Sequence, residues 1–152
     1  GGGLIMDKKI FHGRGNATEV GHMTIEYNGP QDKCGNRGCV EAHASARGIS
    51  AIFGEKNEPV KIYDMAIKGN EKAISTFEQM GHYLGIGLTN MIYAFDPDII
   101  VIGGRIYYSW KFFSKPMREA VKERYFSKPC KIVKSYLKES GILGAAALCL
   151  QR

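Results

Sequence analysis

The sequence predicts an α/β fold within a single unit of 152 residues. In its second half, stretches with helical periodicity alternate with short apolar stretches, an order typical of α/β folds with right-handed crossovers. The aliphatic run at residues 98–102 is continuous rather than alternating, which is typical of a parallel strand covered on both faces. With 44% hydrophobic and 24% charged residues the composition is globular, and no aliphatic run is long enough to cross a membrane.

The first part of the chain is expected to be rich in loops, because ten of the 19 glycines lie in residues 1–48. Residues 4–6 and 9–11 are predicted to form a short hairpin. Residues 23–27 alternate polar and apolar side chains and are a candidate strand. Residues 28–38 have the composition of turns throughout.

Two helices are predicted in the middle of the chain. The spacing of apolar residues favours one helix over residues 40–53. Pro59 precedes a second helix over residues 62–68, which Gly69 ends.

The clearest helix begins after an N-cap at Asn70 and ends before Pro97. Its apolar residues recur at three- and four-residue steps, as one buried helix face requires. Gly81, Gly85 and Gly87 lie inside it, and each costs about 1 kcal/mol relative to alanine in a helix interior. Together they predict close packing of this helix against its neighbours.

The last third of the chain predicts strands at residues 98–102 and 131–137, and helices at residues 109–125 and 143–150. Ligands of open α/β sheets bind beyond the carboxyl ends of the strands.

Gly103 and Gly104 follow the first of these strands and would let a base or a phosphate approach the backbone. An ordinary turn explains the two glycines equally well.

Charge and cysteine content restrict the possible partners. The net charge of +6 suits an anionic ligand such as a nucleotide, although a solvated basic surface also explains it. No helix-turn-helix and no stripe of basic and aromatic residues is present, so no nucleic acid is expected. Four cysteines are too few for a disulfide framework, and no signal peptide or membrane segment is predicted. We therefore expect a cytoplasmic protein.

A candidate metal site lies around Cys34 and Cys39, which flank a turn containing glycine. Tight turns of this kind aim two thiolates at one zinc ion. His22 and Asp32 are close enough in sequence to supply a nitrogen and an oxygen. Two free thiols and an unrelated histidine are the alternative.

Glu19 and Glu41 are candidate ligands of a polyol, because one carboxylate accepts hydrogen bonds from two neighbouring hydroxyls. His22 lies between them in sequence and would complete such a site. Taken singly, each glutamate could also be a surface charge or an acidic residue at a helix N-terminus.

This segment resembles the signature of the ROK family (repressors, open reading frames and sugar kinases). The family pattern is Glu-x-Gly-His, followed about ten residues later by Cys-x-Cys-Gly-x-x-Gly-Cys-x-Glu. The matching positions here are Glu19, Gly21, His22, Cys34, Gly35, Gly38, Cys39 and Glu41. Residues 81–85, 97–104 and 143–148 resemble the family's long helix, nucleotide-side strand and closing helix, and residues 1–5 resemble the end of its phosphate turn.

The resemblance implies the actin-like ATPase fold, which has two RNase-H-like lobes with a cleft between them. This chain would be the C-terminal lobe, a mixed sheet with flanking helices, without the lobe's first strand and without the N-terminal lobe. The sugar would be bound by Glu19, His22 and Glu41. The nucleotide would lie near Gly1, Gly2, Gly103 and Gly104. A structural Zn²⁺ would be held by His22, Asp32, Cys34 and Cys39.

The sequence departs from the family pattern at three points. Asp32 stands where the family has its first cysteine, and a carboxylate oxygen also binds zinc. Thr18 replaces the glycine that usually precedes Glu19. The family's general base belongs upstream of Gly1, so no catalytic residue is expected in this chain, which should be inactive alone and should pair with the missing segment or with another copy.

Three functional hypotheses follow. The first is the C-terminal part of a glucokinase-like enzyme that uses ATP with Mg²⁺ to phosphorylate a hexose or an N-acetylhexosamine. The second is the sugar-sensing effector domain of a ROK-family transcriptional repressor, whose DNA-binding part would lie upstream. The third, a purely structural zinc module, would explain the cysteines but neither Glu41 nor the pair Gly103 and Gly104.

Overall fold

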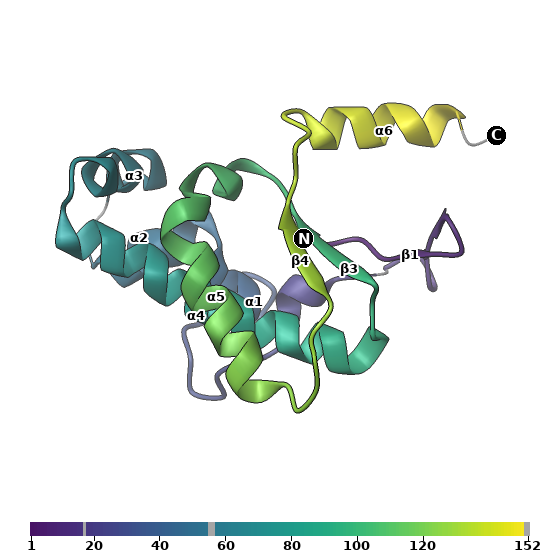
Figure 1. Ribbon diagram of the computed structural model, residues 1–152, viewed down its shortest axis with the longest axis horizontal. Helices are drawn as coiled ribbons and strands as arrows, with labels where there is room; N and C mark the ends of the chain where they lie inside the picture. The colour runs from purple at the N-terminus through teal and green to yellow at the C-terminus, as the bar shows by residue number, and fades with distance from the viewer. Residues whose placement is uncertain (17, 55–56, 151–152) are drawn as a thin grey trace.

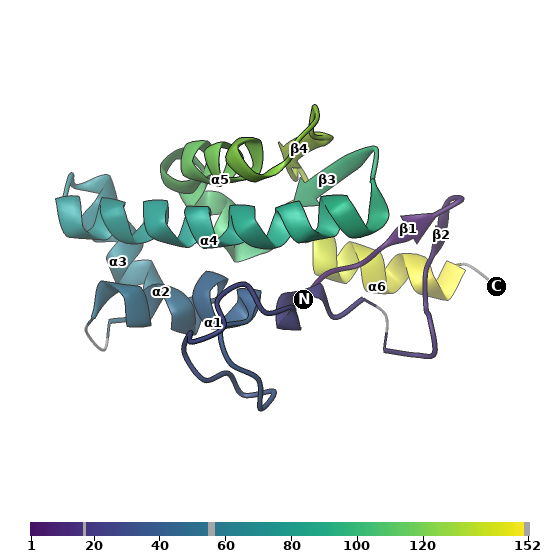
Figure 2. The ribbon, with the colours of Figure 1, turned by 90° about the horizontal axis from the view of Figure 1, so that it is seen from below.

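The long helix α4 (Glu71–Phe95) is the central element of the protein (Figures 1 and 2). A computed structural model describes residues 1–16, 18–54 and 57–150. Figure 2 shows α5 (Trp110–Arg124) on one side of α4, and α1 (Val40–Ala44), α2 (Ala46–Phe53) and α3 (Pro59–Ile67) on the other. The main apolar core lies between these layers and includes Phe77, Met80, Ile92 and Phe113.

Helix α4 begins and ends where the sequence predicts. The Asn70 side chain accepts a hydrogen bond from the backbone N–H of Ala73 at 2.9 Å, which confirms the predicted N-cap. At the other end Asp96 takes a left-handed conformation with φ 41°, and Pro97 follows. A proline disfavours the helical conformation of the residue before it, so the helix stops there.

The glycines of α4 permit close packing on both of its sides. A Cβ atom at Gly85 would lie 2.4 Å from the backbone oxygen of Met117, and one at Gly81 would lie 2.5 Å from that of Phe113. Both neighbours belong to α5. On the opposite side, a Cβ atom at Gly87 would lie 2.5 Å from Cγ2 of Val40 in α1. The close approach predicted from these glycines is confirmed.

The single helix predicted over residues 40–53 is wrong in one respect, because the structure divides it into α1 and α2. Ser45 between them is extended, with φ −108° and ψ 176°, and its side chain accepts a hydrogen bond from the N–H of Gly48. The serine competes with the helix for a backbone donor and begins a new helix as its N-cap. Apolar periodicity continues through the break and therefore conceals it.

Helix α3 begins earlier than predicted, since Pro59 is its first residue rather than a residue before it. A proline at the first helical position lacks only a donor that would be unpaired there anyway. Gly69 ends the helix with φ +85°, as the sequence predicts.

The predicted hairpin is present as strands β1 (Ile5–Met6) and β2 (Lys9–Ile10), which pair in antiparallel register. Asp7 and Lys8 form its turn with positive φ angles of 50° and 63°. The candidate strand at residues 23–27 is not formed. Thr24 makes one isolated bridge to Cys39, while a short 3₁₀ turn, η1 (Val20–His22), precedes it.

Strands β3 (Ile99–Ile102) and β4 (Lys131–Lys134) form the predicted parallel pair, with Ile99 opposite Lys131. The crossover between them runs through a second 3₁₀ turn, η2 (Arg105–Ser109), and α5. β4 ends at Lys134, three residues earlier than predicted.

The expectation that β3 is covered on both faces is wrong for the described residues. Ile100 and Ile102 pack against the core, whereas Ile99 and Val101 are 49% and 55% exposed. In the described part of the chain, the face of β3 that carries Ile99 and Val101 is therefore about half exposed.

The last helix, α6 (Ser140–Leu150), starts three residues before its predicted beginning and projects away from the body of the molecule (Figure 1). None of the helices in the described part of the chain combines the length and apolar character that a membrane crossing requires.

Candidate functional site

The site is built where η1, the loop after it and the start of α1 meet. Backbone hydrogen bonds hold the loop in place: the N–H of Ile25 donates to the carbonyl of Gly38, and that of Gly38 donates to the carbonyl of Pro30. Cys39 is the N-cap residue of α1 and is fully buried. The turn therefore delivers Cys39 directly onto the end of a helix.

Four potential metal ligands come together at this point. One ligand atom from each of His22, Asp32, Cys34 and Cys39 lies within 4.8 Å of all the others. Sγ of Cys39 is 3.1 Å from Oδ2 of Asp32, and Nδ1 of His22 is 3.3 Å from the same oxygen. Ligand atoms at 2.0–2.3 Å from a tetrahedral zinc ion stand roughly 3.3–3.8 Å apart, so this spacing suits zinc after small adjustments.

The chemistry of the cluster also suits a metal. Within the described part of the chain, the buried Nδ1 of His22 makes no hydrogen bond and faces Oδ2 of Asp32 at 3.3 Å, as expected of two atoms that bind the same ion. Two sulfurs, one nitrogen and one carboxylate oxygen form a donor set that zinc accepts. The residues present therefore fit a structural zinc ion.

The charge states of the cluster are coupled through hydrogen bonds. Hydrogen bonds from Cys39 and Cys34 hold the pKa of Asp32 well below its usual value. Burial raises the pKa of the Cys39 thiol to about 11. Without a metal, Cys39 is thus a protonated thiol that donates to an ionised Asp32. A bound cation reverses this preference, because it stabilises the thiolate.

Arg47 is a further member of this cluster that the sequence analysis missed. Its guanidinium, on the first turn of α2, pairs with Oδ1 of Asp32. Fifteen residues separate the two, and no motif connects them.

The three predicted sugar ligands gather around η1. Nε2 of His22 is 3.8 Å from Oε2 of Glu19, so the two ring nitrogens of His22 face the metal cluster and Glu19 respectively. Oε2 of Glu41 lies 3.5 Å from the place that a Cβ atom on Gly21 would occupy. This is an ordinary van der Waals distance, so the carboxylate of Glu41 lies directly beside η1.

The four glycines predicted to lie near a nucleotide fall into two places. Gly1 and Gly2 lie against η1, where a Cβ atom on Gly2 would approach Cγ2 of Val20 to 2.6 Å. Both ribbon views show the N-terminus beside η1 (Figures 1 and 2). Gly103 follows β3, and a Cβ atom there would be 3.6 Å from Oγ of Ser140. Gly104 beside it has φ +75° and open space around it.

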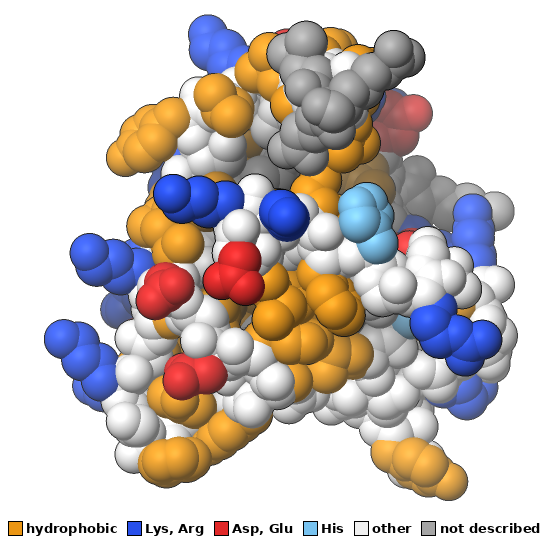
Figure 3. All heavy atoms as spheres, turned by 90° about the vertical axis from the view of Figure 1, so that its right-hand side faces the viewer, with side chains coloured by type: hydrophobic (Ala, Val, Ile, Leu, Met, Phe, Trp, Pro, Cys, Tyr) orange, Lys and Arg blue, Asp and Glu red, His pale blue; other side chains and the backbone are white. Residues whose placement is uncertain are grey.

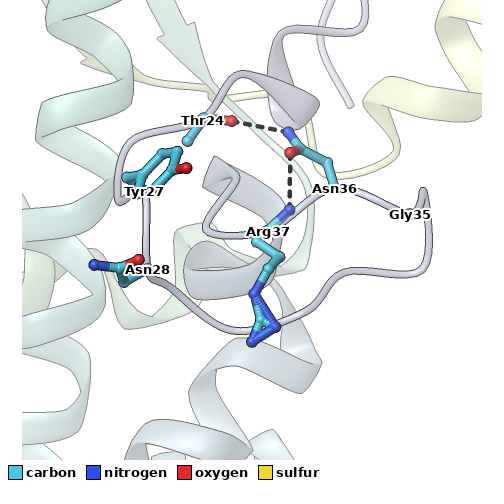
Figure 4. Close-up of a pocket in the computed structure, with 6 residues that line it drawn as sticks. All are labelled: Thr24, Tyr27, Asn28, Gly35, Asn36 and Arg37. Carbon is cyan, nitrogen blue, oxygen red and sulfur yellow. Dashed lines mark hydrogen bonds between the residues drawn. The ribbon is translucent and has the colours of Figure 1, made fainter.

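A hollow of about 380 Å³ lies between two stretches of the loop that follows η1 (Figure 4). Nδ2 of Asn36 donates to Oγ1 of Thr24 at 2.9 Å, and the N–H of Arg37 donates to Oδ1 of Asn36 at 2.8 Å. These bonds close the loop upon itself and so fix the turn between Cys34 and Cys39. The hollow is lined by Thr24, Tyr27, Asn28, Gly35, Asn36 and Arg37.

Comparison with known proteins places these features in one family. The family model described as the ROK family matches residues 1–152. A xylose repressor of Bacillus spizizenii is 35% identical over 128 residues, which cover 82% of this chain and 33% of the repressor. A glucokinase of Thermotoga maritima is 32% identical over 175 aligned residues, which cover 100% of this chain and 55% of the glucokinase.

Among solved structures, a ROK-family glucokinase from Streptomyces griseus in complex with glucose and AMPPNP superposes with a TM-score of 0.87. The two are 26% identical, and the match covers 100% of this chain and 57% of the glucokinase chain. The predicted fold class is confirmed by this likeness. The chain spans between a third and just over half of the length of the relatives it matches.

Proposed function

This chain belongs to the ROK family. We propose that it carries the sugar-binding residues and part of the nucleotide-binding site of an ATP-dependent hexose kinase. The observation that carries the proposal is the convergence of Glu19, His22 and Glu41 around η1. Relatives of both kinds match nearly the whole chain, a glucokinase over 100% of it and a xylose repressor of Caldicellulosiruptor bescii over 99%. Coverage therefore does not choose between the two functions.

The geometry around η1 suits a sugar. Glu19 and Glu41 accept hydrogen bonds from hydroxyl groups, and each carboxylate can serve two neighbouring hydroxyls. His22 offers Nε2 to the same space, while its Nδ1 faces Asp32. A zinc ion held by His22, Asp32, Cys34 and Cys39 would fix the ring of His22 in that orientation. A glucose-like hexose or an N-acetylhexosamine is the substrate class that we propose.

The nucleotide would lie near the end of β3 and near the N-terminal glycines. Gly104 has open space around it, so a nucleotide with its Mg²⁺ can come close to the backbone there. Phosphoryl transfer needs a positioned hydroxyl, a metal-bound phosphate and a base beside the hydroxyl. We assign no base among the residues of this chain. The base that takes the proton of the sugar 6-hydroxyl would come from another part of the longer protein.

A second candidate function is the effector domain of a sugar-responsive repressor, because a xylose repressor matches this chain at 35% identity. In that case the same three side chains would bind a sugar without transferring phosphate to it. Binding with turnover supports the kinase, and binding without turnover supports the repressor.

The cellular compartment that we propose for this protein is the cytoplasm, in which cysteines stay reduced. All four cysteines are free, as in a reducing compartment such as the cytoplasm. The exposed face of β3 and the projecting helix α6 would be covered by the remaining part of the longer protein or by a second copy.

The test is an ADP-release assay on the full-length protein with a panel of hexoses and N-acetylhexosamines. We expect turnover with at least one sugar. Glu41→Gln should reduce kcat/KM by roughly 10- to 100-fold, since a hydrogen bond to a charged group contributes about 1.5–3 kcal/mol. Glu78→Gln, at an exposed position on α4, is the matched control and should leave kcat/KM unchanged.

Undiminished activity of the Glu41→Gln variant would remove the role proposed for Glu41. A folded wild-type protein that binds a sugar in calorimetry but releases no ADP would identify the repressor instead.

A further inference from the structure

The two oxygens of the buried Asp32 carboxylate face different partners. Its side chain is fully inaccessible to solvent. Oδ2 faces His22 and Cys39 at 3.3 Å and 3.1 Å, inside the potential metal cluster. Oδ1 points out of the cluster and pairs with the guanidinium of Arg47.

On the basis of the metal site proposed above, we propose that Arg47 is a positioning residue for the metal ligand Asp32. By holding Oδ1, the guanidinium leaves Oδ2 facing the space between His22, Cys34 and Cys39. Asp32 would then bind the ion through one oxygen, in an orientation fixed from outside the cluster. Partners of this kind determine how a ligand presents itself to a metal.

The identity of the residue at position 32 explains why such a partner is required. A cysteine has one ligand atom, its sulfur, and no second polar atom that would need a hydrogen-bond donor. An aspartate in the same place brings a second oxygen, and a buried oxygen without a donor costs stability. Arg47 supplies that donor. The presence of Asp32 at a position where the ROK pattern has cysteine therefore accounts for Arg47 beside it.

The charges support the same conclusion. Two thiolates and one carboxylate carry three negative charges against the two positive charges of a zinc ion. The site with its ion would hold one excess negative charge beside the buried side chains of Asp32 and Cys39, which is unfavourable without a partner. The side chain of Arg47 is 42% exposed, so it reaches into the cluster while keeping part of its own hydration. It neutralises the excess charge.

The start of α2 places Arg47 where its guanidinium can reach Asp32. The break at Ser45 starts α2, and Arg47 is its second residue. A cation near a helix N-terminus is disfavoured by the helix dipole, so its position there is compensated by the pair with Asp32. Gly48 allows the break to be tight, because a Cβ atom there would lie 2.3 Å from the carbonyl oxygen of His43.

The test measures zinc rather than activity. The full-length protein and its variants are purified, their zinc content is measured by metal mass spectrometry, and their zinc affinity by competition with a chromogenic chelator. We expect wild-type protein to hold one zinc ion per chain. Arg47→Met should weaken zinc binding by roughly 10- to 100-fold, the effect usual for the partner of a metal ligand. Arg47→Lys should retain most of the affinity, and Lys61→Met, at an exposed position on α3, should change nothing.

A double substitution separates this role from a general structural one. In an Asp32→Cys background the carboxylate that Arg47 orients is gone and only the excess negative charge remains, so adding Arg47→Met should weaken zinc binding much less than it does in the wild-type protein. The visible spectrum of the Co²⁺ form provides a second readout, since the bands of wild-type and Arg47→Met protein should differ while those of the two Asp32→Cys proteins agree.

Equal zinc affinity of wild-type and Arg47→Met protein would overturn the proposal. So would a wild-type protein that holds no metal and gains an ion only when Arg47 is replaced, since the guanidinium would then stand in place of the ion. Neither readout depends on sugar phosphorylation, so a failure here is distinguishable from a failure of the proposed kinase function.

Discussion

His43 shows how a single buried side chain makes stability depend on pH. It lies in α1, only 4% exposed, and its ring stacks on that of Tyr83 at 3.9 Å between centroids. Its Nε2 is 3.1 Å from Oε2 of Glu26, the carboxylate that faces it. Burial lowers the pKa of His43 below its ordinary value of 6.5, and Glu26 opposes this only in part. In the folded protein His43 therefore resists protonation.

At the residue scale, we expect the free energy of unfolding to fall as pH decreases below 6.5. In this range the unfolded chain binds a proton at His43 that the folded chain does not bind, so acid favours unfolding. His43→Phe keeps a ring against Tyr83 and removes the titrating group. Urea unfolding at pH 7.5 and 5.5, with metal chelated in every sample, should show a smaller loss for His43→Phe than for wild type. Equal losses in the two proteins would exclude His43 as a source of the effect.

At the element scale, the packing of α4 against α5 depends on positions without a side chain. A Cβ atom at Gly85 would also lie 2.7 Å from Cβ of Ala120, in addition to its approach to the Met117 carbonyl. Neither neighbour is the mobile end of a long side chain. The two helices would have to separate to make room.

We therefore expect Gly85→Ala to destabilise the protein by about 1–3 kcal/mol, the usual cost of overpacking, although alanine favours the helix itself. Gly144→Ala in α6 is the matched control, because nothing lies within 4 Å of a Cβ atom there. Urea unfolding of the two variants measures the difference. A Gly85→Ala protein as stable as the control would show that α5 can shift without cost.

At the scale of the whole molecule, β3 and α6 expose more apolar side chains than a stable monomer normally does. Ile99, Val101, Ile142 and Leu143 are all at least 49% exposed. Figure 3 shows apolar side chains gathered at the centre of one face of the molecule. A helix as uniformly apolar as α6 is normally buried, and large exposed apolar areas mark interfaces.

We expect the 152-residue chain by itself to self-associate in light scattering and to bind an apolar dye. Replacing Ile99 and Val101 together by threonine should shift the chain towards the monomer and reduce dye binding, because it makes the open face of β3 more polar. Val60→Thr in α3 is the control at a similarly exposed position and should leave both signals unchanged. A monomer that binds no dye would contradict this prediction.

The sequence alone determined those features whose causes lie within a few residues. The cap at Asn70, the stop before Pro97 and the hairpin turn depend on local backbone conformation, so their residues predict them directly. The motif spacing likewise picked out the residues that the structure brings together around η1 and the Cys34–Cys39 turn, since both groups lie in one short segment.

Only the tertiary structure decided the break at Ser45, the exposed face of β3 and the pair between Asp32 and Arg47. Apolar periodicity runs unchanged across a helix break, and an aliphatic run does not reveal which of its faces a neighbour covers. The pairing of a carboxylate with a guanidinium fifteen residues away depends on how a loop and a helix pack together, and no local preference encodes that distance.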